Sequence, residues 1–172
     1  MIILKKIIIA LFLVTVLFCL STETSGEVLI PNNAIRFRII ANSNSLEDQE
    51  TKMQIREEIE PVFAEILDQS NSKEETKELI NQNMAKLESI IESFNVEYTI
   101  NYGNNYFPEK EYKGVMYPEG NYESLVITLG SGLGENWWCV LFPPLCLLEA
   151  EEEETNSANY TFYIKEVIEK FS

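Results

Sequence analysis

The segment GENWWCVLFPPLC, residues 134–146, contains both tryptophans and two of the three cysteines of this 172-residue sequence. Its apolar run over residues 137–142 is too short to cross a bilayer and is typical of a strand that is buried on both faces. The double proline at 143–144 ends that strand, because a proline cannot donate a hydrogen bond to a sheet ladder. The prolines also turn the chain, so that Cys139 and Cys146 can come within disulfide reach.

The composition argues against several classes of function. The sequence has 13 Lys+Arg against 28 Asp+Glu, a formal net charge of −15, which repels nucleic acid and anionic lipid headgroups. It has no histidine, the commonest general base and zinc ligand. Its two aspartates, Asp48 and Asp68, do not lie in the Asp-Thr-Gly or Asp-Ser-Gly setting of an aspartic protease. We therefore expect no catalytic residue, no metal, no cofactor and no nucleic-acid partner.

The first 26 residues have the pattern of an address segment that is separate from the fold. Two lysines precede an apolar run over residues 7–20, and a polar stretch to Gly26 follows. A secretory signal peptide and an uncleaved N-terminal membrane anchor both fit this pattern. Either one predicts that the rest of the chain is exported, with transient membrane contact through this segment. Export makes a disulfide between Cys139 and Cys146 the expected state.

A strand is predicted over residues 34–41, where apolar residues alternate with Arg36 and Arg38. The apolar side chains and the two arginines should therefore point to opposite faces of a sheet. The polar residues 42–45 end this strand, and Ser45 is the expected N-cap of a first long helix.

Two amphipathic helices are predicted next. The first has an apolar stripe over residues 55–66, within which Pro61 should kink the helix or restart it. The second begins at Ser72, followed three residues later by Glu75 as in a capping box. Its apolar residues are spaced four, three, four and three apart, which predicts one buried face. They are Ile80, Met84, Leu87, Ile91 and Phe94.

The remaining pattern is that of strands. A turn is predicted at residues 103–105, and the strands are expected over residues 96–102, 112–117, 125–129 and 137–142. This order predicts an α/β fold, a two-layer sandwich in which two long helices pack on one face of a mixed, mainly antiparallel sheet. Residues 27–148 should form this single domain, and residues 149–172 an acidic segment with a short C-terminal helix.

Three blocks occur in order along the chain: residues 35–49, beginning IRFRIIANSNS, residues 117–125, YPEGNYESL, and residues 136–146, NWWCVLFPPLC. Together they resemble the stage II sporulation protein R family of endospore-forming bacteria. The resemblance extends over residues 30–148, and the third block is specific enough to carry it alone. Pro61 departs from the family pattern, and the resemblance does not extend to the acidic run and the final helix beyond Leu148.

The resemblance implies a signalling protein and not an enzyme. A member of this family is made in the forespore and exported into the intermembrane space between forespore and mother cell. There it activates a membrane-embedded aspartic protease of the mother cell, which matures the precursor of sigma factor E. The implied partner of this chain is that protease.

The tryptophans are the first candidates for partner contact. Trp137 and Trp138 are adjacent on a strand and should face opposite sides of the sheet. One should lie in the core, and the other should be available to the partner protease, the receptor of the signal. The alternative function, an exported glycan- or cell-wall-binding module, would use them as stacking platforms, but they cannot both face one ligand. A nucleophile at Cys139 or Cys146 is disfavoured because no histidine is present to activate it.

A second candidate surface combines Arg36 and Arg38 with Asn42 and Ser43, next to a helix N-terminus. This arrangement suits an anion or a carboxylate of a partner. The simpler alternative is that both arginines pair with glutamates of this acidic chain.

Overall fold

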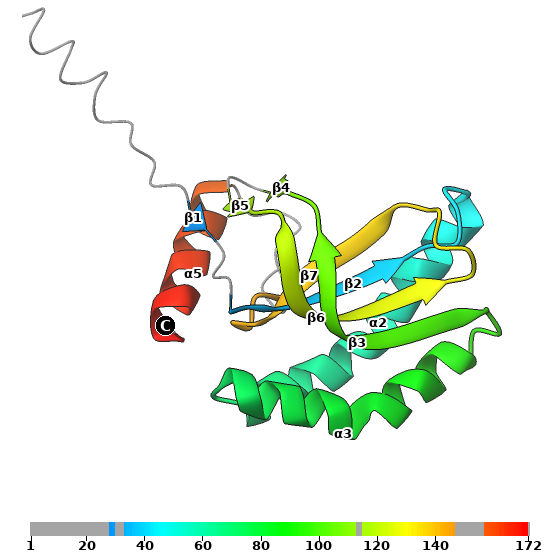
Figure 1. Ribbon diagram of the computed structural model, residues 1–172, viewed down its shortest axis with the longest axis horizontal. Helices are drawn as coiled ribbons and strands as arrows, with labels where there is room; N and C mark the ends of the chain where they lie inside the picture. Colours follow the sequence, from blue (N-terminus) through cyan, green and yellow to red (C-terminus); the bar gives the residue numbers. More distant parts are fainter. Residues whose placement is uncertain (1–27, 30–32, 113–114, 147–156, 172) are drawn as a thin grey trace, which may run out of the picture.

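The computed structural model describes residues 28–29, 33–112, 115–146 and 157–171, and it has the predicted two-layer α/β architecture (Figure 1). One layer is a four-stranded sheet in the order β3-β6-β2-β7. Its strands are β3 (Tyr98–Phe107), β6 (Gly120–Leu129), β2 (Ile35–Ile40) and β7 (Asn136–Phe142). The other layer consists of the helices α2 (Leu46–Gln69) and α3 (Lys73–Glu92).

The sheet is mixed because β2 pairs in parallel with β6, whereas the pairs β2–β7 and β3–β6 are antiparallel. In the middle of the sheet Phe37 lies opposite both Leu125 and Cys139, so three segments that are distant in sequence meet there. The strand predicted over residues 34–41 is confirmed, and β7 ends at Phe142, directly before the double proline.

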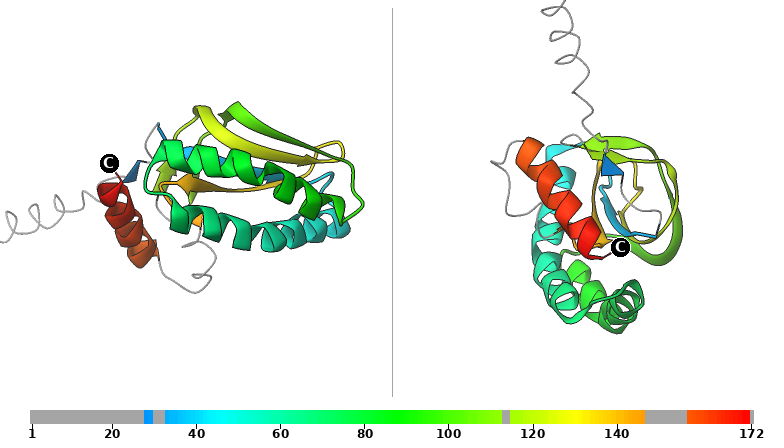
Figure 2. Two further views of the ribbon diagram at one scale, coloured as in Figure 1. Left: turned by 90° about the horizontal axis from the view of Figure 1, so that it is seen from below. Right: turned by 90° about the vertical axis from the view of Figure 1, so that its left-hand side faces the viewer.

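The helices α2 and α3 cover one face of the sheet, as the two views in Figure 2 show. Both predicted N-caps are confirmed, because the Ser45 and Ser72 side chains accept hydrogen bonds from the backbone N–H groups three residues later. The main core lies between these helices and the sheet. It buries the predicted stripes of both helices, with Ile59 and Leu87 fully enclosed.

Pro61 lies inside α2, and the helix continues beyond it to Gln69, so of the two predicted alternatives, a kink or a restart, the restart does not occur. Pro61 is exposed, on the side of the helix away from the core. The hydrogen bond that a proline removes is therefore lost on a surface where water can replace it.

The turn predicted at residues 103–105 is also wrong. β3 runs through it without interruption and pairs with β6 from Tyr98 opposite Leu129 to Phe107 opposite Gly120. Glycine and asparagine are weak strand formers, but the ladder along β6 supplies their backbone partners and overrides that preference.

A second, smaller layer lies over one end of the opposite sheet face, here called the outer face (Figure 1). It is a three-stranded sheet in the order β1-β5-β4. Its strands are β1 (Val28–Leu29), β5 (Val115–Tyr117) and β4 (Lys110–Tyr112). The single strand predicted over residues 112–117 is therefore wrong, because this region holds parts of two short strands. The C-terminal helix α5 (Ser157–Lys170) packs here through Ile164, against Val115 and Tyr117.

No helix in the described part of the chain is long and apolar enough to span a bilayer. The predicted address segment, residues 1–26, and the acidic run at 149–154 lie outside the described residues.

Candidate functional site

Trp137 and Trp138 lie on opposite faces of β7, as predicted. The Trp137 ring packs edge-to-face on Phe37 on the helix side, with 5.9 Å between the ring centres, and the Arg56 guanidinium lies over it. The Trp138 ring packs edge-to-face on Tyr117 on the outer side, at 4.5 Å. Both tryptophans are half-buried, so the expected division into one core residue and one exposed residue does not hold.

Cys139 and Cys146 form a disulfide, with their Cα atoms 5.3 Å apart, and the predicted bond is thereby confirmed. The two prolines reverse the chain between the cysteines, and the Leu145 N–H donates to the Val140 carbonyl at 3.1 Å. The disulfide therefore closes a short loop at the end of the Trp137–Trp138 strand and leaves no free thiol at either position.

Arg36 is fully buried on the outer face, so the expectation that it offers a surface to a partner is wrong. Its guanidinium lies over the Tyr122 ring, 3.5 Å from the ring centre, and within 6 Å of the ring centres of Phe107, Tyr117 and Trp138. The reason for its burial is the second layer, which covers this end of the sheet. Burial lowers the pKa of Arg36, and the neighbouring tyrosines act in the opposite direction.

Arg38 occupies the next outward position of β2 and is half-buried. Its guanidinium lies 4.6 Å from the centre of the Phe107 ring. Phe107 reaches Arg38 because β3 and β6 curl over the outer face, as seen in Figure 2, which also brings Phe107 into contact with Tyr122 and Val126. Glutamate pairing, the simpler alternative, is not seen for either arginine in the described part of the chain.

Asn42 and Ser43 are engaged within the chain. Both donate to one carboxylate oxygen of Asp48, Asn42 at 3.1 Å and Ser43 at 2.5 Å. The Asn42 side-chain oxygen also accepts from the Ser131 backbone N–H at 2.9 Å. These bonds tie the end of β2 to the first turn of α2 and to the loop before β7. They also lower the pKa of Asp48, with the Ser43 hydroxyl as the largest cause.

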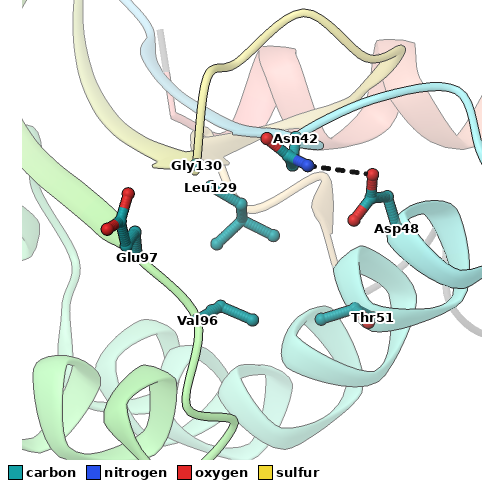
Figure 3. A pocket seen from close by; sticks show the side chains of 7 residues that line it. All are labelled: Asn42, Asp48, Thr51, Val96, Glu97, Leu129 and Gly130. Atoms are coloured by element: carbon teal, nitrogen blue, oxygen red, sulfur yellow. Dashed lines mark hydrogen bonds between the residues drawn. The ribbon is translucent and has the colours of Figure 1, made fainter.

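An open pocket of about 230 Å³ lies beside this loop (Figure 3). Val96 and Leu129 give it an apolar floor, and the Asp48 and Glu97 carboxylates lie on opposite sides of it. The pocket therefore has acidic walls and an apolar floor. One of the two Asp48 oxygens already accepts two hydrogen bonds from within the chain.

The helix side has its own charge cluster, in which Glu123 of β6 bonds Lys73 and Lys77 of α3, each at 2.9 Å. Burial by itself raises the pKa of Glu123, but the hydrogen bonds from the two lysines and from Tyr102 outweigh burial and lower it to about 2. This cluster fastens α3 to the sheet. No group of His, Cys, Asp and Glu within the described ranges could hold a metal ion.

A model of the family described as "Stage II sporulation protein R" matches residues 31–152. The chain belongs to this family. One curated relative, the stage II sporulation protein R of Bacillus subtilis (strain 168), is 39% identical over 133 residues. The match covers 74% of this chain but only 59% of that relative. No solved structure matches the chain.

The part that matches the stage II sporulation protein R family includes every predicted contact residue. The structure separates these residues into three groups. Trp138, Arg36 and Arg38 lie on the outer face, and Trp137 lies on the helix side. Asn42 and Ser43 lie in the loop that leads into α2.

Apart from Trp138, the sequence did not single out the aromatic residues that surround the arginines. For Tyr117 and Tyr122 the available signal is their position in the second family-like block, residues 117–125. For Phe107 there is no sequence signal, because its place over Arg38 follows from the curl of two strands.

Proposed function

We propose that this protein is an exported signal of sporulation that activates a membrane-embedded aspartic protease in the mother-cell membrane. Activation leads to maturation of the sigma factor E precursor. The protein acts from the intermembrane space between forespore and mother cell, after export directed by residues 1–26. The observation that carries the proposal is the family match over residues 31–152, which contains the Trp137–Cys146 block.

The chemistry of the chain supports a signalling role without turnover. The sequence has no histidine, and Cys139 and Cys146 are joined to one another and so supply no thiolate. The net charge of −15 disfavours nucleic acid as a partner. A glycan-binding module has less support, because Trp137 and Trp138 point to opposite faces and each ring is already packed on another aromatic ring.

The test is reconstitution in a non-sporulating bacterial host that produces the membrane protease and the sigma factor E precursor. We expect the precursor to be shortened, as seen on an immunoblot, when the full chain is co-produced and exported. A chain lacking residues 1–26 remains in the cytoplasm and should leave the precursor intact. A protease with its catalytic aspartate changed to asparagine is the second control. Absence of processing with the exported chain, or equal processing with the cytoplasmic chain, contradicts the proposal.

A further inference from the structure

Two of the three arginines of this chain, Arg36 and Arg38, stand on the outer face of β2, where no carboxylate of the described residues pairs with them. The third, Arg56, pairs with Glu60 at 3.1 Å. Arg36 and Arg38 form no ion pair with any described residue, although the sequence has 28 acidic residues. Within the described residues, the central strand therefore carries positive charge that no carboxylate neutralises.

The arginines also have buried donors with no acceptor. Among the described residues Arg36 has one hydrogen-bond acceptor, the Pro118 carbonyl, at a long 3.3 Å from Nη2. Its Nε and Nη1 atoms are buried and unpaired. The Nε atoms of Arg38 and Arg56 are buried and unpaired as well, but Arg56 has the Glu60 carboxylate as an ion-pair partner. Buried polar groups are nearly always hydrogen-bonded, and a charged one without a partner is especially costly. Unpaired donors from two neighbouring guanidinium groups indicate a place for an anion.

We propose that the outer face of β2 is a carboxylate-binding site, in which Arg38 contacts the carboxylate of a partner polypeptide and Arg36 supplies positive charge behind it. Arg38 is the contact residue because it is half-buried, whereas Arg36 is fully enclosed. The inference rests on the proposed function in one respect: it takes the partner polypeptide that carries the carboxylate to be the membrane-embedded protease.

The surroundings of the two arginines favour a carboxylate over a phosphate. The wall over Arg38 is the Phe107 ring, and the Lys110 ammonium lies 5.2 Å from the centre of the Trp138 ring nearby. The guanidinium fork pairs with carboxylate and phosphate alike, but a flat carboxylate fits better than a tetrahedral phosphate beside aromatic rings. A phosphate is held best by free backbone N–H groups, as at helix N-termini and glycine-rich loops. Here the neighbouring backbone belongs to paired ladders of β2, β6 and β7.

Arginine side-chain NMR tests the site directly. The full-length protein, labelled with ¹⁵N-arginine and kept in a neutral detergent at pH 6, should give one Nε–Hε signal for each of its three arginines. The variants R36K, R38K and R56K assign these signals. The protein is titrated with sodium acetate, with sodium chloride at equal ionic strength, and with inorganic phosphate.

Acetate should shift the Arg38 signal to saturation, and the Arg36 signal with it, while the Arg56 signal stays in place. In R38Q the Arg36 signal should no longer respond, whereas in R56Q the responses of Arg36 and Arg38 should persist. Three results overturn the inference: no saturable shift at Arg38, an equal shift with chloride, or saturation with phosphate but not with acetate.

This titration requires no receptor, so its outcome is separate from that of the proposed function. A negative titration with normal precursor processing would refute the carboxylate site alone. Acetate binding without any precursor processing when the exported chain is present would refute the proposed function alone. When both hold, the protease should process at least tenfold less precursor with the exported R38Q chain than with the exported R56Q chain.

Discussion

The guanidinium of Arg36 lies over the ring of Tyr122, with 3.5 Å between the Arg36 Cζ atom and the ring centre. In the interior of a protein a cation is normally held by a carboxylate, but here aromatic rings take that place. A cation over an aromatic face gains about 0.5–2 kcal/mol, depending on how fully it is desolvated. The rings therefore offset part of the cost of burying Arg36, and what they do not offset remains as a penalty on the folded state.

The substitutions R36K and R36M should separate the charge from the packing. We expect R36K to destabilise the fold by about 1–2 kcal/mol, because an ammonium is more strongly hydrated and cannot stack on Tyr122. R36M keeps the apolar stem and removes the buried charge, so its free energy of unfolding should lie closer to the wild-type value. Urea denaturation of the variants measures both. A more stable R36K than R36M would contradict this account.

The substitution E123Q should weaken the attachment of α3 to β6. Glu123 is about a quarter exposed and bonds two lysines, so we expect a loss of about 1–3 kcal/mol at neutral pH. The matched control is E65Q, because Glu65 pairs with Lys86 on the open helix surface. Its free energy of unfolding should stay within about 0.5 kcal/mol of wild type.

The effect of E123Q on the free energy of unfolding should depend on pH. The pKa of Glu123 is lowered from its ordinary value of 4.5 to about 2 in the folded state, so its contribution is fully present above pH 4.5 and is lost as the pH falls toward 2. The stability difference between wild type and E123Q should therefore close over this range. Guanidinium denaturation at several pH values measures the gap, and a constant gap would rule out the lowered pKa.

The substitution G130A should destabilise the loop before β7. Gly130 has a φ of +51°, and an added Cβ would collide with the Asn42 side chain that is bonded to Ser131. We expect a cost of about 1–3 kcal/mol, seen as a lower thermal midpoint. The control is G103A, where the nearest atom would be at an ordinary 3.4 Å. If G130A is as stable as G103A, the loop tolerates the added Cβ, and the close approach of Gly130 to the Asn42 side chain does not limit stability.

Reduction of the Cys139–Cys146 disulfide should cost about 2–3 kcal/mol, because the closed loop is short. We expect the reduced protein to keep its helices and sheet, as measured by circular dichroism, and to lose receptor activation. Thiol alkylation and mass spectrometry of exported protein should find both cysteines blocked, with the double serine variant as the reference. Two alkylated cysteines together with full activity would exclude a structural role for the bond.

The sequence was sufficient where a pattern repeats along one element. The alternation in β2, the four-three spacing in α3 and the serines at both helix starts predicted the main sandwich correctly. Cys139 and Cys146 were also predictable as a pair, because the intervening prolines turn the chain. Each of these features is decided by residues within a few positions of one another.

The errors concern interactions between distant segments. The strand β3 passes through residues 103–105 because β6 supplies its partners, and β6 follows later in the chain. The second layer is built from strands of two or three residues, too short to show any period. Because this layer was not predicted, Arg36 was expected at the surface. The predicted direction of its side chain, away from the apolar face of β2, was correct.

The parallel pairing of β2 with β6 constrains how a chain that emerges N-terminus first can fold. β2, α2 and α3 leave the ribosome or a membrane pore before either neighbour of β2 exists, since Phe37 pairs with Leu125 and Cys139. The apolar faces of these early segments therefore have no sheet to cover them until β7 has emerged. Contacts between distant segments slow folding, because the long loop must be closed before they form. On the export route proposed above, such slow folding would favour threading of the unfolded chain through a narrow pore, with the sheet forming on the far side.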